Sequence, residues 1–294
     1  MSRNAHRNDL AVRRRPGRAS TRLIGLWTGL LAGLLMACGG GGASTGVATG
    51  SPTGTPTGTP GGGTSTPVTR ILWIGNSYTY VNDLPALLTA LSTTAGRSPL
   101  PSITTVLDGG QSLKGAAGRA DISTVMGRGW DIVVLQEQST TPITAPDTML
   151  RYGTQLGEMA KRAGAKVLLF QTWPPGDATP SATAIRAAYD QLARAIGATV
   201  VPVGDAWLQM MTARPDLALY QDDGSHPTAI GTYLAACVFH NLLHNQSAIG
   251  LARESYSVRT NRYAGGLLEP IVKIPLDAAV ALAAQQAADR ATGR

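Results

Sequence analysis

Short apolar segments that alternate with helical patterns constrain the fold of this chain more than any other feature. Five segments are rich in β-branched residues and show little alternation of apolar and polar positions, which is typical of strands covered on both faces. They are Ile71–Gly75, Ile103–Leu107, Ile132–Gln136, Val167–Gln171 and Thr199–Val203. Because helical patterns separate them, the sequence predicts an α/β domain in which helices cover both faces of a five-stranded parallel sheet.

Apolar stripes at helical spacing support this prediction. The stripe formed by Leu84, Leu87, Leu88 and Leu91 follows Asp83, a plausible N-cap. The other stripes are Met149, Tyr152, Leu156, Met159 and Ala163; Ile185, Ala188, Leu192 and Ile196; and, in a last helix, Leu276, Val280, Ala283 and Ala287. Residues 250–270 show no clear periodicity and receive no assignment.

The first 37 residues are typical of an export signal. Basic residues up to Arg22 precede the apolar segment Leu23–Ala37, which is shorter than the roughly 20 residues that span a bilayer. The segment ends in Leu-Met-Ala-Cys, which resembles the lipobox of bacterial lipoproteins. We therefore expect residues 1–37 to be a lipoprotein-type signal peptide and Cys38 to be lipidated. A short membrane anchor with an incidental cysteine is the alternative.

Residues 38–69 are almost purely Gly, Thr, Ser and Pro and are expected to form a flexible tether, because they contain too little apolar surface to offset the entropy of ordering. Residues 70–294 suit one domain. The formal net charge is +7, but seven arginines and one aspartate lie in residues 1–37, so the remainder is nearly neutral. Such a domain lacks the basic surface of nucleic-acid-binding proteins, and no nucleic acid is expected as a partner.

Polar and glycine-rich segments follow the predicted strands, at the sheet edge where α/β proteins bind ligands. Residues 75–79 follow the first strand, residues 108–112 the second and residues 136–139 the third, and residues 222–227 lie near the end of the α/β pattern. Together these segments contain a serine nucleophile, flexible backbone donors, a side-chain amide, and a histidine with a carboxylate three residues before it. Such a set is suited to acyl transfer.

This ordered set resembles the SGNH (GDSL-type) hydrolase superfamily. Residues 75–79 resemble its Gly-Asp-Ser block, and Asp223-Gly224-Ser225-His226 matches its Asp-x-x-His block. Gly110 lies where the oxyanion glycine of the second block falls, and Gln138 where the asparagine of the third block falls. The resemblance covers roughly residues 70–240. It implies the SGNH hydrolase fold, a three-layer α/β/α sandwich with a flavodoxin-like sheet.

Two departures from the family pattern are clear. Asn76 replaces the aspartate of the first block, and Gln136-Glu137-Gln138-Ser139 replaces Gly-x-Asn-Asp in the third. The pattern is closer to a bacterial subgroup that carries Gly-Asn-Ser and Gln-Glu-Gln-Ser blocks.

The resemblance implies a role for each matching residue. Ser77 would be the nucleophile, His226 the general base and acid, and Asp223 the group that orients the imidazole. The backbone N–H groups of Ser77 and Gly110 and the side-chain amide of Gln138 would form the oxyanion hole.

Each of these residues also has an ordinary structural explanation. Asn76 and Ser77 could cap a helix, Gly109-Gly110 could form a turn, and His226 could precede a helix that begins with Pro227. Asp222 is the alternative acidic partner. The order of the blocks and their positions after the strands nevertheless favour the hydrolytic site.

Two further groups of residues need separate explanations. Cys237, His240 and His244 lie on one predicted helix, but the segment lacks the glutamate of a His-Glu-x-x-His site, so no metal is expected there. The hydrolase interpretation also requires no organic cofactor. No disulfide is expected for Cys237 if Cys38 is lipidated. Trp173 and Trp207 follow the fourth and fifth strands, and packing in the core or a lid is favoured over a role in the wall of a substrate cleft.

The sequence thus predicts a lipid-anchored serine hydrolase of the cell envelope that acts on an ester, such as an acetylated glycan or another small ester. Gly39, rather than aspartate, follows Cys38. In a host with two membranes this favours the periplasmic face of the outer membrane or the cell surface. The alternative is a non-catalytic envelope lipoprotein that binds a ligand and retains the fold without the chemistry.

The lipobox interpretation predicts the outcome of replacing Cys38. Cys38→Ala should release the protein from membranes or leave the signal uncleaved, because the variant lacks the thiol that carries the lipid. Membrane fractionation and intact-mass measurement of the mature protein test this. Cleavage at another position, or a mature protein without acyl chains, would contradict it.

Overall fold

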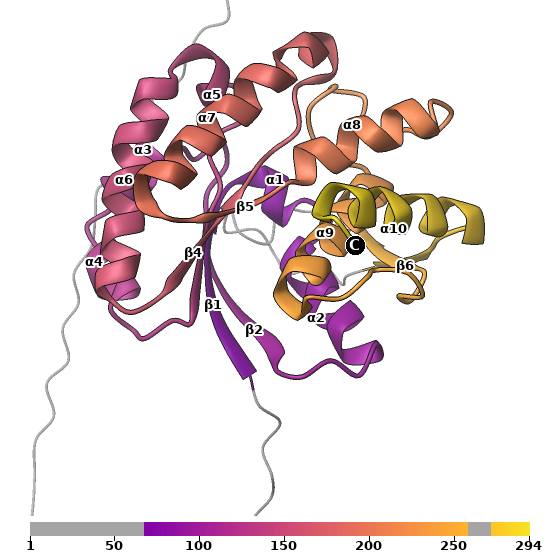
Figure 1. Cartoon of the computed structure of the whole chain (residues 1–294), viewed down its shortest axis with the longest axis horizontal. Coiled ribbons are helices and arrows are strands. Elements are labelled where there is room, and N and C mark those ends of the chain that lie inside the picture. The colour runs from indigo at the N-terminus through magenta and orange to yellow at the C-terminus, as the bar shows by residue number, and fades with distance from the viewer. Residues whose placement is uncertain (1–67, 258–271) are drawn as a thin grey trace, which may run out of the picture. The chain divides into compact units, whose positions relative to one another are not determined.

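Five parallel strands form the centre of the fold in the computed structural model, which describes residues 68–257 and 272–294 (Figure 1). Their spatial order is β2-β1-β3-β4-β5. The strands are β1 (Val68–Gly75), β2 (Leu100–Leu107), β3 (Ile132–Leu135), β4 (Lys166–Phe170) and β5 (Thr199–Val201). All five lie where the apolar segments predicted them. The predicted signal peptide, the lipidation site and the tether as far as Pro67 lie outside the described residues.

Strand β1 is covered on both faces and has a neighbour on both edges. Its residue Ile71 lies opposite Ile103 of β2 on one side and Ile132 of β3 on the other. Ile71 and Trp73 belong to one hydrophobic core, whereas Leu72 and Ile74 belong to the other. This central position explains the unbroken apolar run from Ile71 to Gly75, because these five residues of β1 are all buried. Pairing with β2 includes Val68 and Thr69, two residues that the sequence analysis assigned to the tether.

Helices cover the two faces of the sheet as two separate layers, which confirms the three-layer α/β/α prediction (Figure 1). One layer contains α2 (Leu84–Thr94), α8 (Val203–Ala213), α9 (Ala229–His244) and α10 (Ala278–Thr292). The other contains α3 (Leu113–Ala117), α4 (Ile122–Met126), α6 (Pro146–Arg162) and α7 (Ala182–Ile196). Three short helices follow the carboxyl ends of β1, β3 and β4: α1 (Ser77–Tyr80), α5 (Thr141–Thr144) and η1 (Gly176–Ser181). Within the described ranges, no helix combines the length and the apolar composition needed to cross a membrane.

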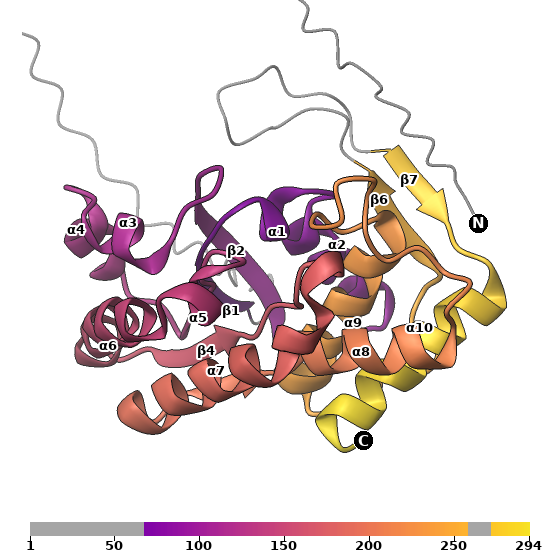
Figure 2. The ribbon, with the colours of Figure 1, turned by 90° about the horizontal axis from the view of Figure 1, so that it is seen from above.

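A second, two-stranded sheet was not apparent from the sequence. Strands β6 (Glu254–Ser257) and β7 (Val272–Pro275) pair antiparallel outside the central sheet, as Figure 2 shows. Each strand has only four residues, which is too short for a periodic pattern to be distinguished from a loop. Part of the unassigned segment 250–270 therefore belongs to β6, and residues 258–271 lie outside the described part of the chain.

The fifth strand and the last helix differ in detail from the predictions. The apolar segment continues to Val203, but β5 ends at Val201 and Val203 begins α8, so one apolar run serves two elements. Helix α10 begins after Asp277, whose carboxylate accepts hydrogen bonds from two N–H groups of its first turn. Its buried face consists mainly of Ala281, Ala284, Ala287 and Ala288, and so is displaced from the predicted stripe. Alanine is only weakly apolar, so the alanine-rich sequence predicted the helix correctly but did not show which of its faces is buried.

Two glycines occupy equivalent positions in different helices, but their replacement by alanine is expected to change the stability of the protein differently. Gly231 in α9 and Gly115 in α3 each donate a hydrogen bond to the side chain that caps their helix. A Cβ at Gly231 would overlap the Trp207 ring and lie 2.7 Å from the carbonyl oxygen of Leu219, whereas the nearest atom to a Cβ at Gly115 is 3.7 Å away.

Gly231→Ala should therefore lower the free energy of unfolding by about 1–3 kcal/mol, the usual effect of overpacking. The matched control Gly115→Ala should leave it unchanged or raise it slightly, because alanine favours a helix over glycine. Urea denaturation of both variants measures the difference. Equal stabilities would contradict the close packing of α9 on Trp207.

Candidate active site

The loop after β1 presents Ser77 at the carboxyl edge of the sheet. Asn76 caps α1, because its side chain accepts a hydrogen bond from the Tyr78 N–H at 3.1 Å. Ser77 is the first residue of that helix, so its N–H has no partner within the helix and its hydroxyl is free to point outward. The ordinary capping explanation thus applies to Asn76 and leaves Ser77 available for another role.

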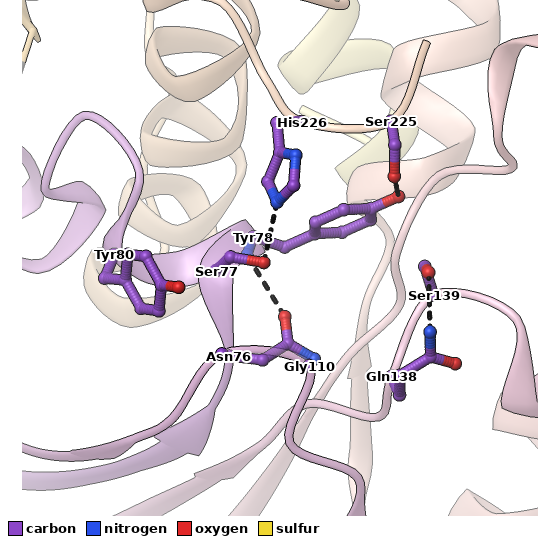
Figure 3. Close-up of a pocket in the computed structure, with 10 residues that line it drawn as sticks. Asn76, Ser77, Tyr78, Tyr80, Gly110, Gln138, Ser139, Ser225 and His226 are labelled. Carbon is purple, nitrogen blue, oxygen red and sulfur yellow. Dashed lines mark hydrogen bonds between the residues drawn. The ribbon is translucent and has the colours of Figure 1, made fainter. Parts of the chain in front are cut away.

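The Ser77 hydroxyl, the His226 ring and the Asp223 carboxylate form a hydrogen-bonded chain (Figure 3 shows its Ser77–His226 part). Ser77 Oγ lies 2.8 Å from His226 Nε2, and His226 Nδ1 lies 2.5 Å from Asp223 Oδ2. Because a carboxylate can only accept, Nδ1 carries a proton and the neutral ring presents Nε2 as the acceptor for the Ser77 hydroxyl. Asp223, rather than the neighbouring Asp222, therefore occupies the position of the acidic partner.

Hydrogen bonds also set the charge of Asp223. Its other oxygen, Oδ1, accepts the backbone N–H groups of Ser225 and His226, both at 2.9 Å. Desolvation raises the pKa of Asp223, but the bonds from His226 and Ser225 together outweigh it and lower the pKa to about 2. The carboxylate is thus ionised at neutral pH, as stabilisation of an imidazolium requires.

A buried stack of aromatic rings supports the loop that carries His226. Tyr78 stacks on Trp173 with ring centroids 4.5 Å apart, and Trp173 stacks on Trp207 at 4.0 Å. The Tyr78 hydroxyl hydrogen-bonds Ser225 Oγ at 2.7 Å, and Trp173 Nε1–H donates to the Ser225 carbonyl at 3.0 Å. Both tryptophans are wholly buried, so they pack in the core beneath the loop and do not wall the cleft.

Asn82 forms a second connection between the loops of Ser77 and His226, which the sequence analysis did not identify. It is buried and has a φ of 59°, in the left-handed region. Its Nδ2 donates to the Pro227 carbonyl and to Thr232 Oγ1, both at 3.0 Å. The sequence offers one indication of this role: Asn82 lies in a turn before a helix, and asparagine adopts the left-handed conformation more readily than most residues.

The two departures from the family blocks are directly bonded to each other. Gln136 Nε2 donates to Asn76 Oδ1 at 2.6 Å, and Gln136 Oε1 accepts the Asn76 N–H at 3.2 Å. Asn76 Nδ2 in turn donates to the Gln111 carbonyl at 2.9 Å. The side chain of an aspartate at 76 would have no N–H to donate, so the asparagine side chain is required for the bond to the Gln111 carbonyl. A Cβ at Gly75 would overlap Gln136 Oε1, which explains the glycine before Asn76.

An open cavity of about 380 Å³ brings the predicted site residues together. Ser77, Gly110, Gln138 and His226 all line it. Gly110 has a φ of 66°, which glycine adopts without strain. No hydrogen-bond partner is found for the N–H groups of Ser77 and Gly110 within residues 68–257 and 272–294. Two unpaired donors beside a serine hydroxyl are suited to binding an oxyanion.

Gln138 lies at the wall of this cavity with its amide held by neighbouring residues (Figure 3). Its Oε1 accepts four hydrogen bonds, from the N–H and hydroxyl groups of Thr140 and Thr141 at the start of α5. Its Nε2 donates to Ser139 Oγ at 3.1 Å. The oxygen is therefore fixed on α5, and only the Nε2 group remains on the cavity side.

The histidines on α9 lie away from the residues that line this cavity. His240 Nε2 accepts a hydrogen bond from Arg97 at 3.3 Å, and His244 Nε2 lies 2.9 Å from Ser92 Oγ. Cys237 is wholly buried, and burial raises the pKa of its thiol. Among the described residues, no group of three or more His, Cys, Asp or Glu side chains is placed to hold a metal ion.

Comparison with known proteins gives matches among solved structures alone. No protein-family model and no curated protein matches the chain. A protein from Slackia heliotrinireducens, described as a putative SGNH hydrolase, is 27% identical, with a TM-score of 0.50, over 60% of this chain and 99% of that one. A DUF4886 family protein from Bacteroides uniformis is 19% identical (TM-score 0.54), over 76% of this chain and 95% of its own. An acetyl xylan esterase is 16% identical (TM-score 0.51), over 59% and 99% of the two chains.

The last two likenesses concern the fold, whereas the first also extends to the sequence. The strand order β2-β1-β3-β4-β5 and the two helical layers are those of the SGNH hydrolase fold. Together with these structural likenesses, they place the chain in the SGNH hydrolase superfamily.

Proposed function

We propose that this protein is a serine hydrolase that cleaves small esters by way of a covalent acyl-enzyme on Ser77. The observation that carries the proposal is the hydrogen-bonded chain from Ser77 through His226 to Asp223 at the edge of an open cavity. Residues that merely pack or cap would not need a serine hydroxyl, an imidazole and a carboxylate in this order. The hydrolase structures to which the chain is similar support the same class of reaction.

The geometry supports a two-step mechanism. Ser77 Oγ attacks the ester carbonyl while its proton passes to His226 Nε2, and the N–H groups of Ser77 and Gly110 stabilise the oxyanion. His226 then gives the proton to the leaving alkoxide. A water molecule then attacks the acyl-enzyme while its proton passes to the same ring, and the ring returns the proton to Ser77 Oγ as the bond to the acyl group breaks. The ionised Asp223 stabilises the imidazolium in both steps.

We assign the Gln138 side chain as a third oxyanion donor. Its Oε1 is anchored on Thr140 and Thr141, and so the amide can present only Nε2 to a substrate. That group would exchange its bond to Ser139 Oγ for one to the oxyanion, without moving the anchored oxygen.

The cavity favours a small acyl group on a polar alcohol. Its lining includes the hydroxyl groups of Tyr80, Ser139 and Ser225, which can bond a polar alcohol. We propose an acetylated glycan or another small ester as the substrate, reached from a lipid anchor at Cys38 on the cell envelope.

Substitution of the three hydrogen-bonded residues should separate the enzyme from a non-catalytic binding protein. Ser77→Ala and His226→Ala should each abolish most hydrolysis of p-nitrophenyl acetate, and the double variant should be little worse, because the two groups act as one unit. A fluorophosphonate should label the purified wild type at Ser77, as located by peptide mass spectrometry. The matched control Ser123→Ala, on the exposed face of α4, should leave labelling unchanged.

Two adjacent aspartates provide a second control for the same prediction. Asp223→Asn should reduce kcat, though less than either Ser77→Ala or His226→Ala, because nucleophile and base remain. Asp222→Asn should be nearly silent. Absence of labelling at Ser77 in the wild type would overturn the proposal and favour the binding protein.

Replacement of Gln138 tests its role, because loss of an oxyanion donor and loss of a wall residue affect different kinetic parameters. Gln138→Ala should lower kcat about 10²-fold and leave KM little changed, because an oxyanion donor acts mainly in the transition state. Circular dichroism should show that the variant is folded. A change in KM at constant kcat would instead show that Gln138 only shapes the cavity.

A further inference from the structure

A buried carboxyl group lies behind the site and takes no part in the mechanism proposed above. Glu137 follows β3, and its side chain is wholly buried. A carboxyl group is seldom buried without a charged partner, because desolvation strongly disfavours its ionised form. The contacts of Glu137 indicate what it does there.

The carboxyl group of Glu137 joins two loops of the site. Its Oε1 accepts the N–H of Leu113 at 3.1 Å and the N–H of Gln138 at 2.7 Å. Leu113 lies three residues after Gly110, at the start of α3, so one oxygen atom holds both the loop after β2 and the loop after β3. Its Oε2 has no hydrogen-bond partner within the described part of the chain.

The backbone of Glu137 also contacts the loop that carries Ser77. Its carbonyl accepts a hydrogen bond from Asn76 Nδ2 at 3.4 Å, and its N–H donates to the Tyr189 hydroxyl at 3.3 Å. Asn76 immediately precedes Ser77. Glu137 therefore contacts each of the three loops that carry an oxyanion donor.

The charge state of this carboxyl group changes near neutral pH. Burial raises its pKa to about 7, and the bonds from the Gln138 and Leu113 N–H groups limit the rise. The titratable side chain that faces it is Tyr189 of α7, whose own pKa is raised by burial and which is neutral in this range. An ionised acceptor forms hydrogen bonds roughly twice as strong as a neutral one. Protonation would therefore weaken both bonds across the two loops.

We propose that Glu137 is a positioning residue, whose ionised carboxylate holds the loops of Gly110 and Gln138 in the arrangement that stabilises the oxyanion. The inference rests on the proposed hydrolase function. Glu137 touches no substrate and acts through the backbone of Leu113 and Gln138. Its effect should consequently appear in turnover, with little change in substrate binding.

Glu137→Gln is the sharpest test. Glutamine has nearly the same volume and keeps an acceptor at Oε1, but it has no charge, and its NH₂ group would occupy the site where Oε2 finds no partner. The kcat for p-nitrophenyl acetate at pH 8 should fall on the order of tenfold, with KM changed less than about twofold. The acid limb of the wild-type kcat profile should contain an ionisation of Glu137 near pH 7 that is absent from the profile of the variant.

Glu158→Gln is the matched control, because Glu158 lies on the surface of α6, where it pairs loosely with Lys161 at 3.8 Å. It should preserve both kcat and the shape of the profile. Thermal unfolding provides a readout independent of catalysis. A raised pKa in the folded state means that Glu137 contributes stability that is present below about pH 4.5 and is lost as the pH rises through about 7. The melting temperature of Glu137→Gln relative to wild type should hence increase from pH 5 to pH 8.

The possible outcomes are distinguishable. A lower kcat, the loss of one ionisation and the pH-dependent stability difference together support the proposal. If the wild type is active but Glu137→Gln matches Glu158→Gln in kcat and profile, or its stability difference does not vary with pH, the positioning role is wrong and the hydrolase stands. If the wild type neither hydrolyses esters nor labels at Ser77, the proposed function fails and the positioning role fails with it.

Discussion

The buried side-chain amide of Asn76 joins the loops on which the site is built. It caps the helix of Ser77, bonds the Gln111 carbonyl in the loop after β2, and bonds Gln136 and the Glu137 carbonyl after β3. Only a group with both a donor and an acceptor can make these contacts together. Because a buried amide left without partners is costly, the three loops are constrained to one relative arrangement.

The fourth loop, which carries Asp223 and His226, is fixed by different means. Asn82 bonds the Pro227 carbonyl, and Tyr78 and Trp173 bond Ser225 from beneath. Asn82 and Tyr78 are close to Ser77 in the sequence, and Trp173 belongs to the core. The short distance between Ser77 and His226 therefore does not depend on those two side chains alone, although they are 149 positions apart.

Sequence reasoning located the strands and the site loops because these depend on local patterns. A strand buried on both faces requires an unbroken apolar segment, and parallel connectivity puts every site loop at one edge. Sequence reasoning failed where the hydrophobic pattern was weak, or where one apolar run continued from one element into the next. β6 and β7 are too short to show a period, the apolar run at Val203 continues from strand into helix, and the alanines of α10 differ little in hydropathy around the helix.

The sequence by itself determined the α/β class, the order of the site blocks and the residues capable of acyl-transfer chemistry, since residue type and spacing along one strand or turn carry that information. Tertiary structure alone decided which atoms meet. It paired His226 with Asp223 rather than Asp222, turned the Gln138 oxygen onto α5, and placed the Glu137 carboxyl between two loops. Each of these contacts depends on the direction in which the backbone turns, because that direction decides which side chain faces which neighbouring segment. That direction is set by packing and hydrogen bonding across the whole domain, which local periodicity does not encode.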